Sequence, residues 1–355
     1  MTPPAGAVGV RAQGRMPPVA SMERAFESRG VQVVLAAGAV LGALIGLQTL
    51  VLHLTMDPLA DVHAYYDAGA RLNAGLPLYD QPAGTDDAAF YRYPPLLAVA
   101  FRPLALLPFW TAALIWEAFL LVLFAATVHR SGLRNRWTWL VMGWLAAPIA
   151  WSLAVGQAQV AVTYLVILGT PSGIALAANL KLLPILVAVY WVGRRDRRAF
   201  GRLLAWLAGL VVLSFVLEPS GTVAYLGFPD LAQVGNVENL SLYATSPLLW
   251  AGFVAGLAAL ALRFAPRRAG WALAVALSVL ASPRLLMYQL STLQAAIRPP
   301  DSDDGDRLAH GGPAKADQHR TDHDDDPEPH PLGGVGGRED RGEEGELATD
   351  EEHGG

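Results

Sequence analysis

Long apolar runs constrain this chain more than any other feature. A helix needs about 20 mostly apolar residues to cross a hydrocarbon core about 30 Å thick. Runs approaching or exceeding this length occur at residues 31–55, 109–128, 137–155, 203–217 and 247–264. Inside lipid every backbone polar group must be bonded within the protein, which limits spanning segments to helices and closed barrels. The sequence therefore predicts an all-α integral membrane protein.

The charged residues divide the chain into two parts. Residues 299–355 hold 18 of the 31 acidic residues but only 5 of the 26 basic ones, and they contain few apolar side chains. A segment of that composition cannot bury enough apolar surface to offset the entropy lost on ordering. We therefore expect a cytoplasmic N-terminal segment at 1–30, a membrane domain at 31–298 and a disordered acidic tail at 299–355.

Basic residues set the expected orientation. Four arginines precede the first span, so the positive-inside rule places that end in the cytoplasm. Residues 56–93 then form an acidic outer loop, in which 61–74 has the apolar spacing of a short helix. Prolines interrupt 93–108 and predict an interfacial or re-entrant segment, while 158–193 predicts half-helices broken around 181–184. We count about eight membrane segments.

Acidic residues gather directly after the first span. Asp57 and Asp61 stand where a lipid headgroup would be presented, and Tyr65 follows one helical turn later. A carboxylate in this position can act as a general base toward an acceptor hydroxyl. The same acids also suit the first turn of a helix, where negative charge is stabilised. The residues alone leave both interpretations open.

Three cations in the membrane domain are candidate phosphate ligands. Arg92 stands beside Tyr93 in a Tyr-Arg-Tyr-Pro-Pro run, Lys181 interrupts an apolar stretch, and Arg284 follows the last full span. A guanidinium can bind phosphate through its planar fork, and a lysine at membrane depth faces the protein interior or snorkels outward. The alternatives are an interfacial aromatic belt around Arg92 and a half-helix anchored by Lys181.

Two polar residues on the outer side are candidate sugar ligands. Gln157 follows a span and a glycine, and its amide can bond a sugar hydroxyl, although a helix break with a polar cap is the commoner explanation of such a residue. Asn239 lies in the second outer loop, 218–246, where an ordinary polar loop is the alternative. No P-loop, dinucleotide fingerprint or metal-ligand spacing occurs in the membrane domain. We therefore expect no cofactor and no nucleic-acid partner.

Six stretches occur in a characteristic order: DVHAYYDAGARLNAGLPLYD (61–80), FYRYPPLLAVAFRPLALLP (90–108), GQAQV (156–160), ALAANLKLLPIL (175–186), ENLSL (238–242) and SPRLLMYQL (282–290). As a set they resemble glycosyltransferase family 87, which contains polyprenol-phosphate-mannose-dependent α-1,2-mannosyltransferase-like membrane proteins with the GT-C fold. The resemblance implies a GT-C-like bundle whose first outer loop carries the active site.

The resemblance also implies a reaction. An acceptor hydroxyl, activated by an aspartate, attacks a polyprenyl-phosphate-linked sugar, with mannose the family's commonest assignment, and inverts the anomeric centre without a metal. The implied residues are Asp61 and then Asp57 as the base; Arg92, Lys181 and Arg284 as phosphate ligands; and Tyr65, Tyr93, Gln157 and Asn239 as acceptor or sugar ligands. The acceptor is a glycolipid or polysaccharide, reached from the outer face of the plasma membrane.

Two alternatives remain open at this point. Family members continue with further membrane helices where this chain changes to its acidic tail, which is compatible with an inactive, truncated relative. A lipid or solute transporter is the second alternative, but transporters commonly show internal repeats and a mid-membrane site. The polar residues of this chain gather at one face instead, which favours a transferase.

Overall fold

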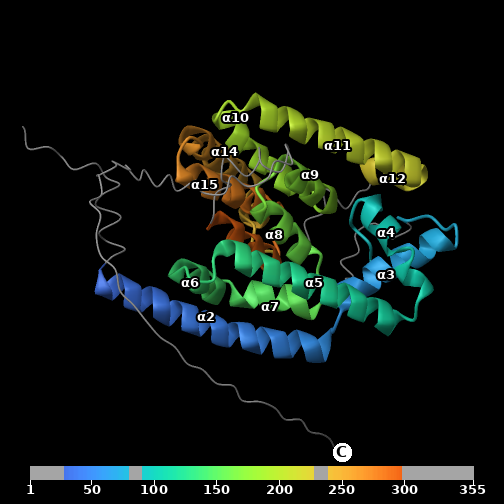
Figure 1. The fold of residues 1–355 in the computed structure, drawn as a ribbon, viewed down its shortest axis with the longest axis horizontal. Coiled ribbons are helices and arrows are strands. Elements are labelled where there is room, and N and C mark those ends of the chain that lie inside the picture. The colour runs from blue at the N-terminus through green and yellow to red at the C-terminus, as the bar shows by residue number, and fades with distance from the viewer. Residues whose placement is uncertain (1–27, 80–89, 228–238, 298–355) are drawn as a thin grey trace, which may run out of the picture. The chain divides into compact units, whose positions relative to one another are not determined.

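The computed structural model describes residues 28–79, 90–227 and 239–297, all within one compact unit of the chain. The predicted acidic tail and all but the last three residues of the predicted N-terminal segment lie outside these ranges. Every regular element in the described residues is a helix, which confirms the all-α prediction for this part of the chain (Figure 1).

Four described helices are long and apolar enough to cross a membrane. They are α2 (Arg29–Met56), α5 (Phe109–Ser131), α11 (Arg197–Leu217) and α14 (Pro247–Phe264). A fifth candidate is the pair α6 (Arg136–Trp144) and α7 (Ala146–Ala154), which is bent by 67°. The chain is thus a multi-pass membrane protein, and among the described residues the predicted count of about eight segments is not confirmed.

The bend between α6 and α7 corrects the single straight span predicted for 137–155. Helix α6 ends at Trp144, and Pro148 stands in the first turn of α7. Because a proline ring clashes with the carbonyl four residues earlier and donates no hydrogen bond, it favours a break at that point.

Shorter helices connect these spans and form the inner parts of the fold. They are α3 (Ala60–Asn73), α4 (Pro95–Phe101), η1 (Leu104–Leu106), α8 (Gln159–Ile167), α9 (Pro171–Leu180), η2 (Leu183–Val187), α10 (Ala188–Gly193), α12 (Pro219–Leu226), α13 (Leu242–Thr245), α15 (Arg268–Leu280) and η4 (Met287–Ala296). The predicted short helix at 61–74, the interrupted segment at 93–108 and the break near 181–184 are confirmed. A further break separates α8 from α9.

Two clusters of buried side chains organise the described residues. The first joins α3, α4 and α5 and includes Tyr65, Phe101 and Leu120. The second joins α8, α9, α10, α11 and α15 around Trp271, which is fully buried and donates a hydrogen bond from Nε1 to the Ala295 carbonyl at 2.7 Å. The outer faces of the long helices instead carry exposed Leu, Val and Ile side chains, as expected for contact with lipid.

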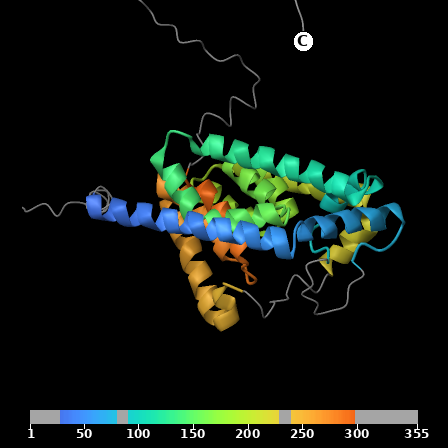
Figure 2. The same cartoon turned by 90° about the horizontal axis from the view of Figure 1, so that it is seen from below.

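Helix α2 runs alongside α6 and α7, and a row of small residues lets the backbones approach closely (Figures 1 and 2). Gly38, Gly42 and Gly46 are spaced four apart and face this pair. A Cβ atom on Gly42 would stand 2.3 Å from the Gly143 carbonyl oxygen, which is backbone and cannot move aside. Small residues at such spacing are how membrane helices pack, because lipid supplies no hydrophobic drive between them.

We expect Gly42→Leu to destabilise the folded chain by about 1–3 kcal/mol, because the added side chain has no space against α6. Thermal unfolding of the purified protein in detergent measures the change. Gly30→Leu is the matched control, since nothing lies within 4 Å of a Cβ at Gly30 in the same helix. Equal melting temperatures for the two variants would contradict this packing argument.

Candidate active site

Six of the nine predicted site residues line one cavity with a volume of about 690 Å³. They are Asp57, Asp61, Arg92, Tyr93, Lys181 and Arg284. These side chains come from segments up to 227 positions apart, at the end of α2, the start of α3, the 90–93 segment, the α9–η2 break and the 282–286 segment. The fold thus gathers two carboxylates and three cations at one site.

Backbone hydrogen bonds fix Asp61 at the start of α3. The Leu59 and Asp61 amides donate to the carbonyls of Ala154 and Val155, each at 3.1 Å, where α7 ends. Leu59 has a φ of 57°, a strained value for a residue with a side chain, and this turns the chain from α2 into α3. Asp61 therefore stands in the first turn of α3, whose partial positive charge stabilises a carboxylate.

The cavity changes the protonation of Asp61. Burial raises the pKa of the Asp61 carboxyl to about 6, while the charges of Lys181 and Arg92 oppose that rise. Asp57 adds to the rise through like-charge repulsion, and a hydrogen bond from the Gln157 side chain opposes it. A carboxyl group with this pKa is mainly ionised at neutral pH but remains basic enough to accept a proton.

Gln157 is held immediately behind Asp61 and is 1% exposed. Its amide oxygen accepts hydrogen bonds from the hydroxyls of Tyr65, at 2.9 Å, and Tyr93. Burial raises the pKa of both tyrosines, so these hydroxyls stay protonated and remain donors. With its oxygen occupied, the amide presents its NH₂ group to Asp61, so Gln157 and Tyr65 support the carboxylate from outside the cavity lining.

Gly156, directly before Gln157, occupies a position that favours glycine. Its φ is +68°, which favours glycine, and a Cβ there would stand 2.2 Å from a Val62 methyl group. Its carbonyl oxygen accepts a hydrogen bond from Trp116 Nε1 at 2.8 Å. This turn places Ala158, at the start of α8, where its backbone amide donates to the Tyr65 hydroxyl at 3.2 Å, and it directs Gln157 inward.

Lys181 adds a basic group to the cavity, and no described side chain accepts a hydrogen bond from it. Its Nζ atom is buried without a hydrogen-bond partner and lies 4.4 Å from the ring centroid of Tyr288 and 5.5 Å from that of Tyr93. Aromatic faces attract a cation but leave its three donors unused. Burial lowers the pKa of this amine to about 7, opposed by the charge of Asp61. An anionic group in the cavity would favour the charged form of Lys181 and could accept its unused hydrogen-bond donors.

Asn239 forms hydrogen bonds to the backbone on both sides of Arg284. Its amide nitrogen donates to the Pro283 carbonyl at 3.0 Å, and its oxygen accepts from the Leu285 and Ser241 amides at 3.0 and 2.9 Å. Asn239 is not part of the cavity lining, and these bonds indicate that it positions Arg284. Its prediction as a sugar ligand remains a prediction.

We expect Asn239→Ala to lower the melting temperature, because two backbone amides lose their acceptor and each unsatisfied bond costs about 1–3 kcal/mol. Asn239→Asp retains an acceptor oxygen for those amides and should be closer to the wild type. Thermal unfolding in detergent compares the two variants. An alanine variant as stable as the wild type would refute the view that Asn239 holds the 283–285 backbone in place.

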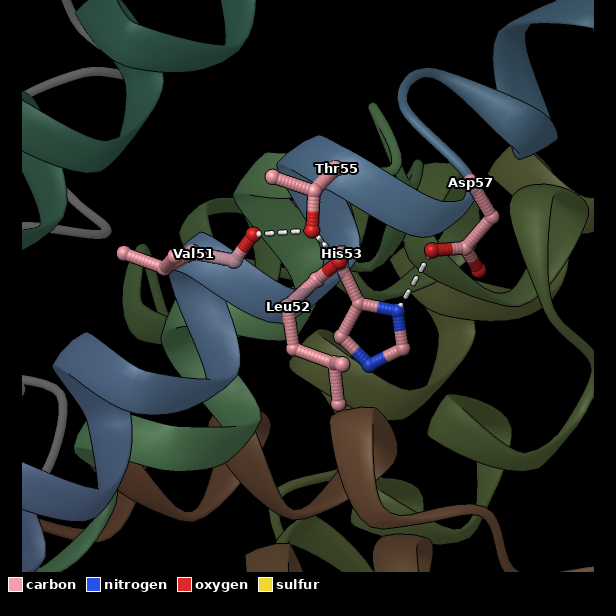
Figure 3. A network of polar contacts seen from close by, with 5 residues as sticks. All are labelled: Val51, Leu52, His53, Thr55 and Asp57. Carbon is pink, nitrogen blue, oxygen red and sulfur yellow. Dashed lines mark hydrogen bonds and ion pairs between the residues drawn. The ribbon is translucent and has the colours of Figure 1, made fainter.

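Asp57 has a partner of its own on α2 (Figure 3). His53 Nδ1 and Asp57 Oδ1 lie 2.8 Å apart, and the imidazole stacks on Trp151 with ring centroids 4.5 Å apart. Asp57 thereby lines the cavity with its side chain 44% exposed, whereas burial is the main influence on the pKa of Asp61. The ranking of Asp61 ahead of Asp57 as the base, which the family resemblance implies, stays a prediction.

The cavity wall also contains uncharged residues that were not predicted from the sequence. Among them are Trp151, Gln159, Tyr288 and Thr292. Gln159 and Tyr288 stood inside stretches that were singled out, so their polarity within apolar runs was an available signal. Trp151 and Thr292 carried no such signal, because their role depends on helices that meet only in the fold. Within the described residues, no group of three or more His, Cys, Asp or Glu side chains is placed to hold a metal ion.

The model of glycosyltransferase family 87 matches residues 90–283, which is more than half of the chain. The chain belongs to glycosyltransferase family 87. The match includes Arg92, Gln157, Lys181 and Asn239 but begins after Asp61 and ends one residue before Arg284. The family match thus covers five of the nine predicted site residues, Tyr93 being the fifth, and leaves Asp57, Asp61, Tyr65 and Arg284 outside.

Relatives with curated functions are mannosyltransferases. A polyprenol-phosphate-mannose-dependent alpha-(1-2)-phosphatidylinositol mannoside mannosyltransferase of Mycolicibacterium smegmatis is 30% identical over 267 residues, 64% of this chain and 59% of the relative. A pentamannoside mannosyltransferase with the same donor dependence, from the same organism, is 27% identical over 205 residues, or 52% and 49%. Its counterpart in Mycobacterium tuberculosis is 29% identical over 208 residues, or 52% and 47%.

The chain spans about half the length of the curated relatives it matches. No solved structure matches it significantly.

Proposed function

We propose that this family 87 chain is a membrane glycosyltransferase that moves a sugar, mannose in our assignment, from a polyprenyl-phosphate donor to an acceptor hydroxyl. The observation that carries the proposal is that Asp61 and Lys181 line the same cavity. The Asp61 carboxylate can serve as the base, and the Lys181 amine can bind the leaving phosphate. The relatives' dependence on polyprenol-phosphate-mannose supports the choice of donor.

The reaction is a direct displacement. Asp61 takes the proton of the acceptor hydroxyl as its oxygen forms a bond to the anomeric carbon of the sugar. The bond from that carbon to the phosphate oxygen breaks on the opposite side, so the anomeric configuration inverts. The departing polyprenyl phosphate gains negative charge, which preorganised cations stabilise in a site of low dielectric.

Lys181 is the central ligand for that phosphate. Its unused donors face no competing hydrogen bond from the described residues. Arg92 and Arg284 line the same cavity and add positive charge, and the braced 282–285 segment keeps Arg284 in place. Apolar residues of the wall, among them Leu180 and Leu183, supply a surface for the first part of the lipid chain.

The ends of the spanning helices support an extracytoplasmic site. Helix α2 begins at Arg29 and ends beside Asp57, and α11 begins with Arg197, Arg198 and Arg202 while its other end leads into α12 and the cavity. In both helices the basic end is opposite the cavity. The positive-inside rule assigns such ends to the cytoplasm. We therefore place the site at the outer face of the plasma membrane, with a glycolipid such as a phosphatidylinositol mannoside as acceptor.

We expect Asp61→Asn to abolish transfer, because the amide cannot accept the acceptor proton; loss of a positioned general base costs about 10²–10⁴-fold. The measurement is transfer of radiolabelled mannose from polyprenyl-phosphate mannose in membranes that contain the chain. Asp67→Asn is the control, since Asp67 is exposed on the same helix and does not line the cavity.

The assay also separates the proposed transferase from its alternatives. Full transfer by Asp61→Asn would refute the assignment of the base. Absence of transfer by the wild-type chain, with phosphatidylinositol mannosides and other envelope acceptors supplied, would favour the inactive-relative or transporter alternatives.

The pKa of Asp61 predicts the pH dependence of transfer. Because burial raises this pKa to about 6, the carboxylate is present above that pH and is lost as the pH falls through it. The rate at subsaturating acceptor should therefore fall with decreasing pH below about 6, approaching tenfold per unit. Initial rates in buffers from pH 5 to pH 8 test this, and a profile that is flat across pH 6 would contradict it.

A further inference from the structure

The cavity wall contains an amide with an unused hydrogen-bonding atom. Gln159, in the first turn of α8, lines the cavity and is 4% exposed. Its Nε2 atom donates to Thr292 Oγ1 at 2.6 Å, but its Oε1 atom is buried with no hydrogen-bond partner among the described residues. A buried acceptor without a donor is energetically unfavourable, so a ligand that donates at this point would bind with a free-energy gain.

Neighbouring hydroxyls fix the orientation of this amide. Thr292 Oγ1 lies 2.8 Å from Thr163 Oγ1, which itself donates to the Gln159 carbonyl at 2.9 Å. Thr163 and Thr292 are both nearly fully buried. One end of the Gln159 amide is therefore held at Thr292, and the oxygen at its other end has no hydrogen-bond partner in the part of the chain that the structure describes. Turning the amide over would exchange its oxygen for its NH₂ group but would still leave one unsatisfied polar group there.

Aromatic rings stand in the same wall. Trp151 and Tyr288 both line the cavity, with ring centroids 5.9 Å apart and planes at 78°. The Tyr288 ring also lies 4.4 Å from Lys181 Nζ. The part of the cavity lining that contains Gln159 and Tyr288 therefore lies next to Lys181, the residue assigned to the donor phosphate. Aromatic faces for C–H groups, together with an amide for hydroxyls, form a surface that suits a sugar ring.

We propose that Gln159, held in place by Thr292, binds a hydroxyl of the sugar carried by the lipid-phosphate donor. This inference rests on the proposed function and names the residue that distinguishes a sugar-bearing lipid from the sugar-free product. It also separates the two glutamines of the Gly-Gln-Ala-Gln segment: the Gln157 oxygen is bonded by two tyrosines, whereas the Gln159 oxygen has no hydrogen-bond partner among the described residues.

The test compares the binding of two lipids to the full chain in nanodiscs. The probes are polyprenyl-phosphate mannose and polyprenyl phosphate without a sugar. Gln159→Met keeps the length of the side chain but removes its hydrogen bonds. We expect its dissociation constant for the mannosylated lipid to rise about tenfold, as for the loss of one good hydrogen bond, and its constant for the sugar-free lipid to stay within about twofold.

Gln294→Met is the matched control. Gln294 is 2% exposed and also has a buried oxygen without a hydrogen-bond partner, but it does not line the cavity. This variant should bind both lipids as the wild type does. Thr292→Val removes the anchor of the Gln159 amide and should reduce discrimination between the lipids, which gives a second measurement if Gln159→Met fails to fold.

Three outcomes would overturn the inference. They are an unchanged preference for the mannosylated lipid in Gln159→Met, an equal loss of affinity for both lipids, and the same selective loss in Gln294→Met. In each of these the wild type still binds the mannosylated lipid, so the proposed function stands. A wild-type chain that binds neither lipid would instead overturn the proposed function and the inference together.

Discussion

The attachment of α3 to the end of α7 is the constraint on which the site depends. Two backbone amides at Leu59 and Asp61 donate to the last carbonyls of α7, and Gly156 then lets the chain pass against Val62. Backbone bonds of this kind fix the position of a residue independently of its side chain. The backbone position of Asp61 is therefore set by the fold itself, and a preorganised position of this kind is what the general base that we propose would require.

The charged half of the site could be predicted from the sequence because charges in a membrane domain are rare and costly. Asp61, Arg92, Lys181 and Arg284 were selected on that ground, and the structure places them on one cavity. Their convergence could not be derived from spacing, since it depends on how distant helices pack. The resemblance to family 87 supplied the link, and the family match itself does not include Asp61.

Uncharged residues were harder to assign, for a physical reason. An amide or hydroxyl serves the fold or a ligand according to whether its partners lie within the protein, and the sequence does not list partners. Gln157 and Asn239 are both predicted as sugar ligands, and this stays a prediction. In the structure two tyrosines donate to the Gln157 oxygen, and Asn239 has three backbone partners. The single span predicted at 137–155 rests on the length of the apolar run alone, whereas Pro148 within that run favours the bend that the structure shows.

The glycine row on α2 also determines how deep the site stands in the bilayer. A helix of 28 residues rises about 42 Å, against a hydrocarbon core of about 30 Å. Such a helix must either tilt or project into the headgroup layer. Because α2 packs against α6 and α7, its tilt is set together with the orientation of those helices. The length of α2 beyond the glycine row therefore sets how far Asp61 stands from the bilayer centre, and with it the depth at which the proposed lipid substrates would present their headgroups.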